Sequence, residues 1–156
     1  MRLSSCLLFV FLLVSGCHSP DEPLPYPITM NKEGLGPIRI GDAFEIGAIQ
    51  GKLPGFTVEK MSRVTPERSE TVFFLKRGEM VLAHIFPGDD ARAIEAITLC
   101  TEQIQDIRGQ RIGTKIQGSK DLLCSGATCR YGTEPSLRYL IDPETRIIRE
   151  ITLQKL

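Results

Sequence analysis

Short β-type segments separated by turns are the commonest expected elements of the sequence, and they constrain the fold more than any other feature. Glu70–Lys76 and Glu79–Phe86 are rich in β-branched, aromatic and leucine residues. Only Arg77-Gly78 separates them, and two residues ending in glycine between β-type runs predict a tight hairpin. Further strands are expected at Thr57–Met61 and Arg92–Leu99.

Two short helices are expected beside these strands. Asp42 precedes a segment, Phe44–Leu53, in which apolar residues recur at near-helical spacing, so Asp42 is expected to be an N-cap. A second helix-like segment spans Thr114–Leu123. Helices that pack on an antiparallel sheet predict the α+β fold class.

A glycine turn, a helix-like segment and a closing strand occur twice in the sequence. Arg39-Ile-Gly41 opens the first unit, and Arg111-Ile-Gly113 opens the second, 72 positions later. The closing strands Ile94–Leu99 and Ile148–Leu153 both read Ile-x-x-Ile-Thr-Leu. We therefore expect two tandem repeat units, 34–100 and 106–156, within a single α+β domain of residues 28–156.

The N-terminal segment indicates export and a lipid anchor. Arg2 precedes the apolar run Leu7–Val14, whose eight residues are too few to span a membrane. The following Ser15-Gly16-Cys17 completes a sequence that resembles the lipobox of bacterial lipoproteins. The resemblance implies a signal peptide at 1–16 and acylated Cys17. By resemblance to the sorting rule of enterobacterial lipoproteins, His18 in the next position implies the outer membrane, on its periplasmic face. An ordinary signal peptide that contains a cysteine is the alternative.

Residues 17–27 are expected to form a spacer between the lipidated cysteine and the domain. Prolines at positions 20, 23, 25 and 27 favour an extended conformation. Such a segment rises about 3.1 Å per residue, so ten residues extend roughly 30 Å.

The five cysteines divide by position. Cys6 leaves with the signal peptide, and Cys17 carries the lipid. Cys124 and Cys129 flank Ser-Gly-Ala-Thr, a turn composition, and thiols outside the cytoplasm tend to pair. Cys100 is then expected to be a buried free thiol, although connectivity cannot be deduced from sequence and Cys100 could pair with either of the other two.

The residue pattern predicts no catalytic residues, no metal site and no cofactor. His84 lies in a strand, where a packed or surface histidine is the common outcome. The alternatives are Cys100 as a nucleophile, zinc bound by Cys124 and Cys129 together with Cys100 and His84, and cation binding or acid/base chemistry at Asp89-Asp90. Lysine plus arginine balances aspartate plus glutamate at 19 each, without a basic block, so nucleic-acid binding is not expected.

Several glycine-based motifs resemble the RpoE-regulated lipoprotein family, a YfeY-like domain of unknown function. They are Gly34-x-Gly36-Pro37 followed by Ile40-Gly41, then Leu53-Pro-Gly-Phe56, then Arg111-Ile-Gly113 and a later cysteine pair. The resemblance covers Gly34 to the C-terminus and implies an envelope lipoprotein without assigned activity. Two cysteines of that family lie where Cys124 and Cys129 occur, whereas Cys100 has no counterpart.

The sequence thus predicts an outer-membrane-anchored periplasmic lipoprotein that acts as a non-enzymatic interaction or envelope-maintenance module. Its expected partners are the membrane, through acylated Cys17, and an unidentified envelope protein. The alternative functions are a periplasmic thiol/redox or hydrolytic enzyme and a small-ligand binder.

Overall fold

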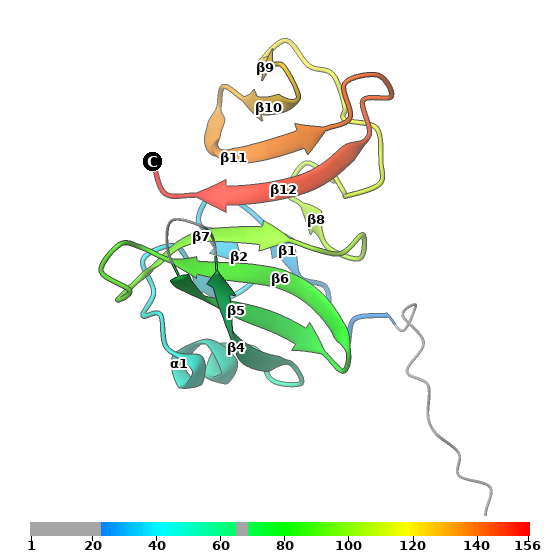
Figure 1. Cartoon of the computed structure of the whole chain (residues 1–156). Coiled ribbons are helices and arrows are strands. Elements are labelled where there is room, and N and C mark those ends of the chain that lie inside the picture. Colours follow the sequence, from blue (N-terminus) through cyan, green and yellow to red (C-terminus); the bar gives the residue numbers. More distant parts are fainter. Residues whose placement is uncertain (1–22, 65–68) are drawn as a thin grey trace, which may run out of the picture.

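The computed structural model describes residues 23–64 and 69–156, and these residues form mainly β-strands (Figure 1). Eight strands make one antiparallel sheet, in the spatial order β4 (Thr57–Val64), β5 (Ser69–Arg77), β6 (Met80–Pro87), β7 (Ile94–Leu99), β12 (Ile148–Gln154), β11 (Glu134–Ile141), β10 (Thr128–Tyr131) and β9 (Leu122–Ser125). A small second sheet has the order β3 (Ile38–Arg39), β2 (Gly34–Leu35), β1 (Thr29–Met30) and β8 (Gln105–Asp106). The strands β1 and β8 are parallel, and helix α1 spans Ile46–Lys52.

One face of the large sheet forms the hydrophobic core. In β12, for example, Ile148, Ile151 and Leu153 are fully buried, whereas Glu150 and Thr152 between them are half-buried. The side chains across the core come from the small sheet, α1 and the connecting turns: Met30, Leu35, Ile38, Phe44, Ile49, Leu53 and Phe56. In Figure 1 the small sheet accordingly lies behind the large one.

The opposite face of the large sheet, the open face, points away from the core. Side chains alternate between the two faces of a strand, so this face carries the residues between the buried ones. It includes Met61, Phe74, His84, Phe86, Thr98, Cys100, Leu123, Arg130, Arg138, Leu140, Glu150 and Thr152, all half-buried or exposed. Within the described residues, α1 and the small sheet both pack on the other face.

The expected α+β class with two helices is wrong, because the fold is β-rich and its described part has one short helix. Thr114–Leu123 contains Gly118 and is not helical. Instead, the N–H of Ile116 donates to the carbonyl of Arg146 at 3.0 Å, so that this segment pairs with the chain before β12. The carbonyl of Gln117 accepts the Tyr131 hydroxyl at 2.7 Å. Tertiary hydrogen bonds therefore replace the i to i−4 bonds that a helix would need.

Helix α1 begins later than expected. Its N-cap is Glu45, and Asp42 lies outside it. The Asp42 carboxylate instead accepts the backbone N–H of Arg39 at 2.6 Å and the ammonium of Lys52 at 2.6 Å. Asp42 thus closes the turn that precedes the helix.

The predicted hairpin is present, with its turn moved by one residue. Arg77 pairs with Met80, so the two turn residues are Gly78 and Glu79. Gly78 has φ +56°, a left-handed conformation that glycine adopts without a Cβ penalty. The first residue of this two-residue turn has a positive φ, so glycine is favoured at that position.

The two halves of the large sheet meet at β7 and β12. Thr98 lies opposite Thr152, its counterpart 54 positions later, with 2.9 Å between their hydroxyl oxygens. Gly41 and Gly113 each donate the backbone N–H to the first residue of the closing strand, at 2.8 Å in both cases. The second unit, residues 106–156, contains no helix, so the helix is not duplicated. The duplication of the glycine turns and closing strands stays a prediction.

The N-terminal end of the described chain packs on the domain. Leu24 and Tyr26 contact the core cluster, and the Tyr26 ring meets Phe56 edge-on at 5.5 Å between centroids. The Arg77 guanidinium donates a hydrogen bond to the carbonyl of Pro23. Packing therefore begins before Ile28, the expected start of the domain. In the described part, no helix has the length and apolar character needed to cross a bilayer.

Candidate functional site

The centre of the open face is a row of side chains on adjacent strands. Thr98 and Thr152 share a hydrogen bond, and the Thr152 hydroxyl lies 2.9 Å from the Glu150 carboxylate, an acceptor. On the other side of Thr98, His84 stacks on Phe74 with 4.3 Å between ring centroids. The row therefore combines aromatic, hydroxyl and carboxylate groups on one accessible surface.

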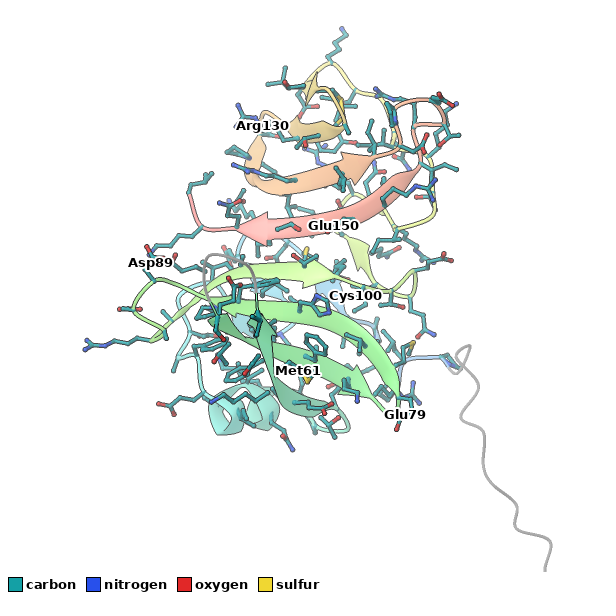
Figure 2. The ribbon with its side chains drawn as sticks, in the orientation of Figure 1. Met61, Glu79, Asp89, Cys100, Arg130 and Glu150 are labelled. Carbon is teal, nitrogen blue, oxygen red and sulfur yellow. A yellow bond between two sulfur atoms is a disulfide. The ribbon has the colours of Figure 1, made fainter. Side chains whose placement is uncertain are left out.

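Cys100 lies at the end of β7, next to Glu150 on β12 (Figure 2). It is exposed rather than buried as expected, and its thiol donates to the carbonyl of Thr98 at 3.7 Å. Partial burial of the sulfur raises the pKa of Cys100 to about 11; a hydrogen bond with the His84 backbone opposes this rise and the charge of Glu150 adds to it. Such a thiol is almost entirely protonated at neutral pH, so it is a poor nucleophile.

Cys124 and Cys129 face each other across the β9–β10 hairpin, and their sulfurs lie 2.08 Å apart, at disulfide bonding distance. The oxidised state of this pair in the cell stays a prediction. Cys17, the predicted lipidation site, lies outside the described residues.

A polar centre lies inside the domain, between the loop after β8 and strand β11. Asp106 is 1% exposed, yet its carboxyl group accepts three hydrogen bonds. The backbone N–H groups of Arg108 and Gln110 each lie 2.8 Å from Oδ1, and the Tyr139 hydroxyl donates to Oδ2. Burial raises the pKa of Tyr139 far above its ordinary range, and the hydrogen bond to Asp106 raises it further.

Arg108 extends the polar centre to the surface. Its guanidinium donates to Glu134 at 2.8 Å and to the Thr133 hydroxyl at 2.7 Å, and it lies 4.1 Å from the centroid of the Tyr131 ring. Gln110 donates to the Tyr131 hydroxyl at 2.9 Å. Because these groups have partners within the protein, we interpret the centre as a structural brace between the loop and the sheet.

The remaining sequence candidates do not assemble into a site. Asp89 and Asp90 lie exposed in the turn between β6 and β7, and Figure 2 shows Asp89 at the edge of the molecule. Among residues 23–64 and 69–156, no group of three or more His, Cys, Asp or Glu side chains is placed to bind a metal ion. His84 and Cys100 therefore do not join the cysteine pair in a metal centre.

Two surface depressions have relevant chemistry. A groove of about 560 Å³ lies where the described chain begins, and it is lined by Pro23, Leu24, Tyr26, Pro27, Ile28, Thr29, Gln103, Gln105 and Arg111. A depression of about 250 Å³ lies on the open face beside the cysteine pair, and it is lined by Leu123, Cys124, Ser125, Thr128, Cys129, Arg130 and Arg138. Sequence reasoning identified neither, because each collects residues from separate strands or loops.

Comparison with known proteins finds a structural relative. No protein family model matches the sequence, and no curated protein matches it. The fold is similar to the crystal structure of the uncharacterized protein YfeY from Escherichia coli, with a TM-score of 0.63 and 15% sequence identity. The similarity covers 81% of this chain and 99% of YfeY. The chain therefore has a YfeY-like fold.

Proposed function

We propose that this protein is a lipoprotein of the RpoE-regulated, YfeY-like family, held on the periplasmic face of the outer membrane by acylated Cys17. In this proposal it is a non-enzymatic interaction module of the cell envelope. The Val14-Ser15-Gly16-Cys17 sequence supports the anchor, and the YfeY-like fold supports the choice of family.

The open face of the large sheet carries the proposed interaction role. Three large apolar side chains of this face are substantially exposed: Met61 at 41%, Leu123 at 54% and Leu140 at 42%. Aromatic rings lie among them, at Phe74 and Phe86. A surface that joins apolar, aromatic and charged groups resembles the composition of protein interfaces.

A short tether follows from the packing of the N-terminal end. Five residues separate Cys17 from Pro23, whose carbonyl is bound by Arg77. A fully extended chain rises about 3.5 Å per residue, so the lipid and the domain are separated by at most about 20 Å. The domain is therefore expected to stay close to the membrane, with less reach than a free spacer of ten residues would give.

The alternative functions have weaker support. A thiol or redox enzyme needs a reactive cysteine, and the raised pKa of Cys100 disfavours one. A small-ligand binder would use the groove of about 560 Å³ beside Pro23, which is open to solvent.

The anchor is tested by labelling cells with a fatty-acid probe and fractionating their membranes. We expect acyl label and outer-membrane location for the wild type, and neither for Cys17→Ser. Cys6→Ser is the matched control and is expected to keep both, because Cys6 leaves with the signal peptide. Acyl label on the Cys17→Ser protein would refute the anchor.

A further inference from the structure

Two arginines lie side by side at the β9 end of the open face. Cys129 of β10 is paired with Tyr139 of β11, and both are buried against the core. The adjacent residues, Arg130 and Arg138, therefore point to the open face, where both are exposed and line the same depression. Figure 2 shows Arg130 on β10, at the far end of the sheet from α1.

These two guanidinium groups have no acidic partner among the described residues. By contrast, Arg108 pairs with Glu134 and Arg149 pairs with Asp142. No carboxylate lines the depression that Arg130 and Arg138 share. Like charges on adjacent strands repel each other, and an anion bound between them would relieve this repulsion. A carboxylate fits this pair, because the planar guanidinium group can bind it through two parallel hydrogen bonds.

Two apolar side chains lie next to the arginine pair. Leu123 of β9 is directly opposite Arg130, and Leu140 follows Arg138 on the same face of β11. The cysteine pair joins β9 to β10 beneath the depression. A covalent link between the strands would hold this surface in one shape before binding, which lowers the entropy cost of association.

We propose that Arg130 and Arg138 form the centre of a docking site for an acidic, extended segment of a partner protein, with leucine-type side chains beside its carboxylates. This inference rests on the proposed interaction role of the open face and names the chemistry of its partner.

The position of the depression favours a protein over the lipid surface. Pro23, six positions after Cys17, is bound at the end of β5, and the order of the sheet puts β10 five strands away. At about 4.8 Å per strand this separation is roughly 24 Å. Figure 1 shows the first described residues at the side of the molecule, near β5 and β6, and the β9–β10 hairpin at one end. The arginine pair therefore lies away from the point where the chain leads to the anchor, which favours a protein as its partner.

The site is tested with the mature full-length chain in detergent micelles and a fluorescein-labelled peptide of alternating Glu and Leu, measured by fluorescence anisotropy. We expect salt-sensitive binding that the Arg130→Ala/Arg138→Ala variant weakens roughly tenfold or more. The Arg130→Lys/Arg138→Lys variant should be intermediate, since it keeps the charge and loses the planar fork. Arg92→Ala, at an exposed arginine in the β6–β7 turn, is the matched control and should bind like the wild type.

Equal affinity of the wild type and the double-alanine variant would overturn the site. Binding of anionic phospholipid vesicles through the two arginines, with no binding of the peptide, would overturn the choice of a protein partner. The Cys17→Ser protein should bind the peptide as the wild type does, so failure of the anchor and failure of the site give separate results. Circular dichroism melts of all variants check that the fold is retained.

Discussion

The hydrogen bond from Tyr139 to Asp106 is expected to contribute measurably to the stability of the domain. Tyr139→Phe keeps the ring in the core and removes only the hydroxyl group. Asp106 Oδ2 then has no donor among the described residues, because the two backbone N–H groups bind Oδ1. A buried acceptor left unsatisfied costs about 1–3 kcal/mol, so we expect the free energy of unfolding to fall by about 2 kcal/mol.

Urea unfolding followed by far-UV circular dichroism measures this loss. With a slope of about 1.5 kcal/mol per molar urea, the midpoint should fall by roughly 1.3 M. Tyr26→Phe is the matched control, because it removes an exposed hydrogen bond to the carbonyl of Pro54 at 3.2 Å. That control should change the free energy of unfolding by less than about 0.5 kcal/mol. Equal losses in the two variants would refute the assigned role of the polar centre.

The same pair predicts an alkaline limit of stability. Burial raises the pKa of Tyr139 above its ordinary value of 10.0 in the folded state. Below pH 10 the tyrosine is protonated in both states, whereas above pH 10 it ionises in the unfolded state only. Stability should therefore fall as pH rises above 10, by up to about 1.4 kcal/mol per pH unit for one proton. Tyr139→Phe should lose less stability than the wild type between pH 10 and 11.

Three further outcomes concern the turns and the cysteines. Cys124→Ser should lower the free energy of unfolding in urea by about 2 kcal/mol, because the disulfide closes a short loop. If reduction with dithiothreitol leaves the free energy of unfolding of the wild type unchanged, the pair is not oxidised. Hydrogen bonds from the backbone and side chain of Thr145 lower the pKa of Asp142 to about 2, so stability should decline as pH falls from 4 to 2, and less in Asp142→Asn. In Cys124→Ser/Cys129→Ser, iodoacetamide should modify Cys100 at pH 8 roughly a hundredfold more slowly than a cysteine peptide. Reaction at the rate of the peptide would contradict the raised pKa of Cys100.

The strands of the first half could be predicted because their signals are local. Glu70–Lys76 and Glu79–Phe86 carry β-type residues on both sides of a glycine turn, and the structure pairs them. The repeated Ile-x-x-Ile-Thr-Leu sequence likewise marked β7 and β12. The pairing of Thr98 with Thr152 at the centre of the sheet could not be predicted, because it depends on the register between β7 and β12.

The errors arose where distant contacts decide the conformation. The apolar residues of Thr114–Leu123 suggested a helix, but pairing with the chain before β12 holds the segment extended. Strand β11 was not predicted, although Leu137, Tyr139 and Ile141 alternate there, because Pro135 weakens the β signal at its start.

The candidate sites depend on the register of the sheet, which no local pattern contains. Arg130 and Arg138 are eight positions apart in the sequence, and only the β10–β11 pairing brings them to one depression. Asp106 is 33 positions from Tyr139, and its burial is unexpected for a carboxyl group. The proximity of Cys124 and Cys129 could be predicted, because the turn composition between them is a local signal.

Site-specific photo-crosslinking in cells tests the proposed open-face interaction most directly. A photoreactive residue at Leu140 lies on the open face beside the arginine pair, whereas one at Glu144 lies in the exposed turn before β12. We predict an adduct with an envelope protein from Leu140, its loss in the Arg130→Ala/Arg138→Ala background, and no adduct from Glu144. The absence of a protein adduct from Leu140, or adducts of equal yield from both positions, would contradict the proposal that this face binds a partner.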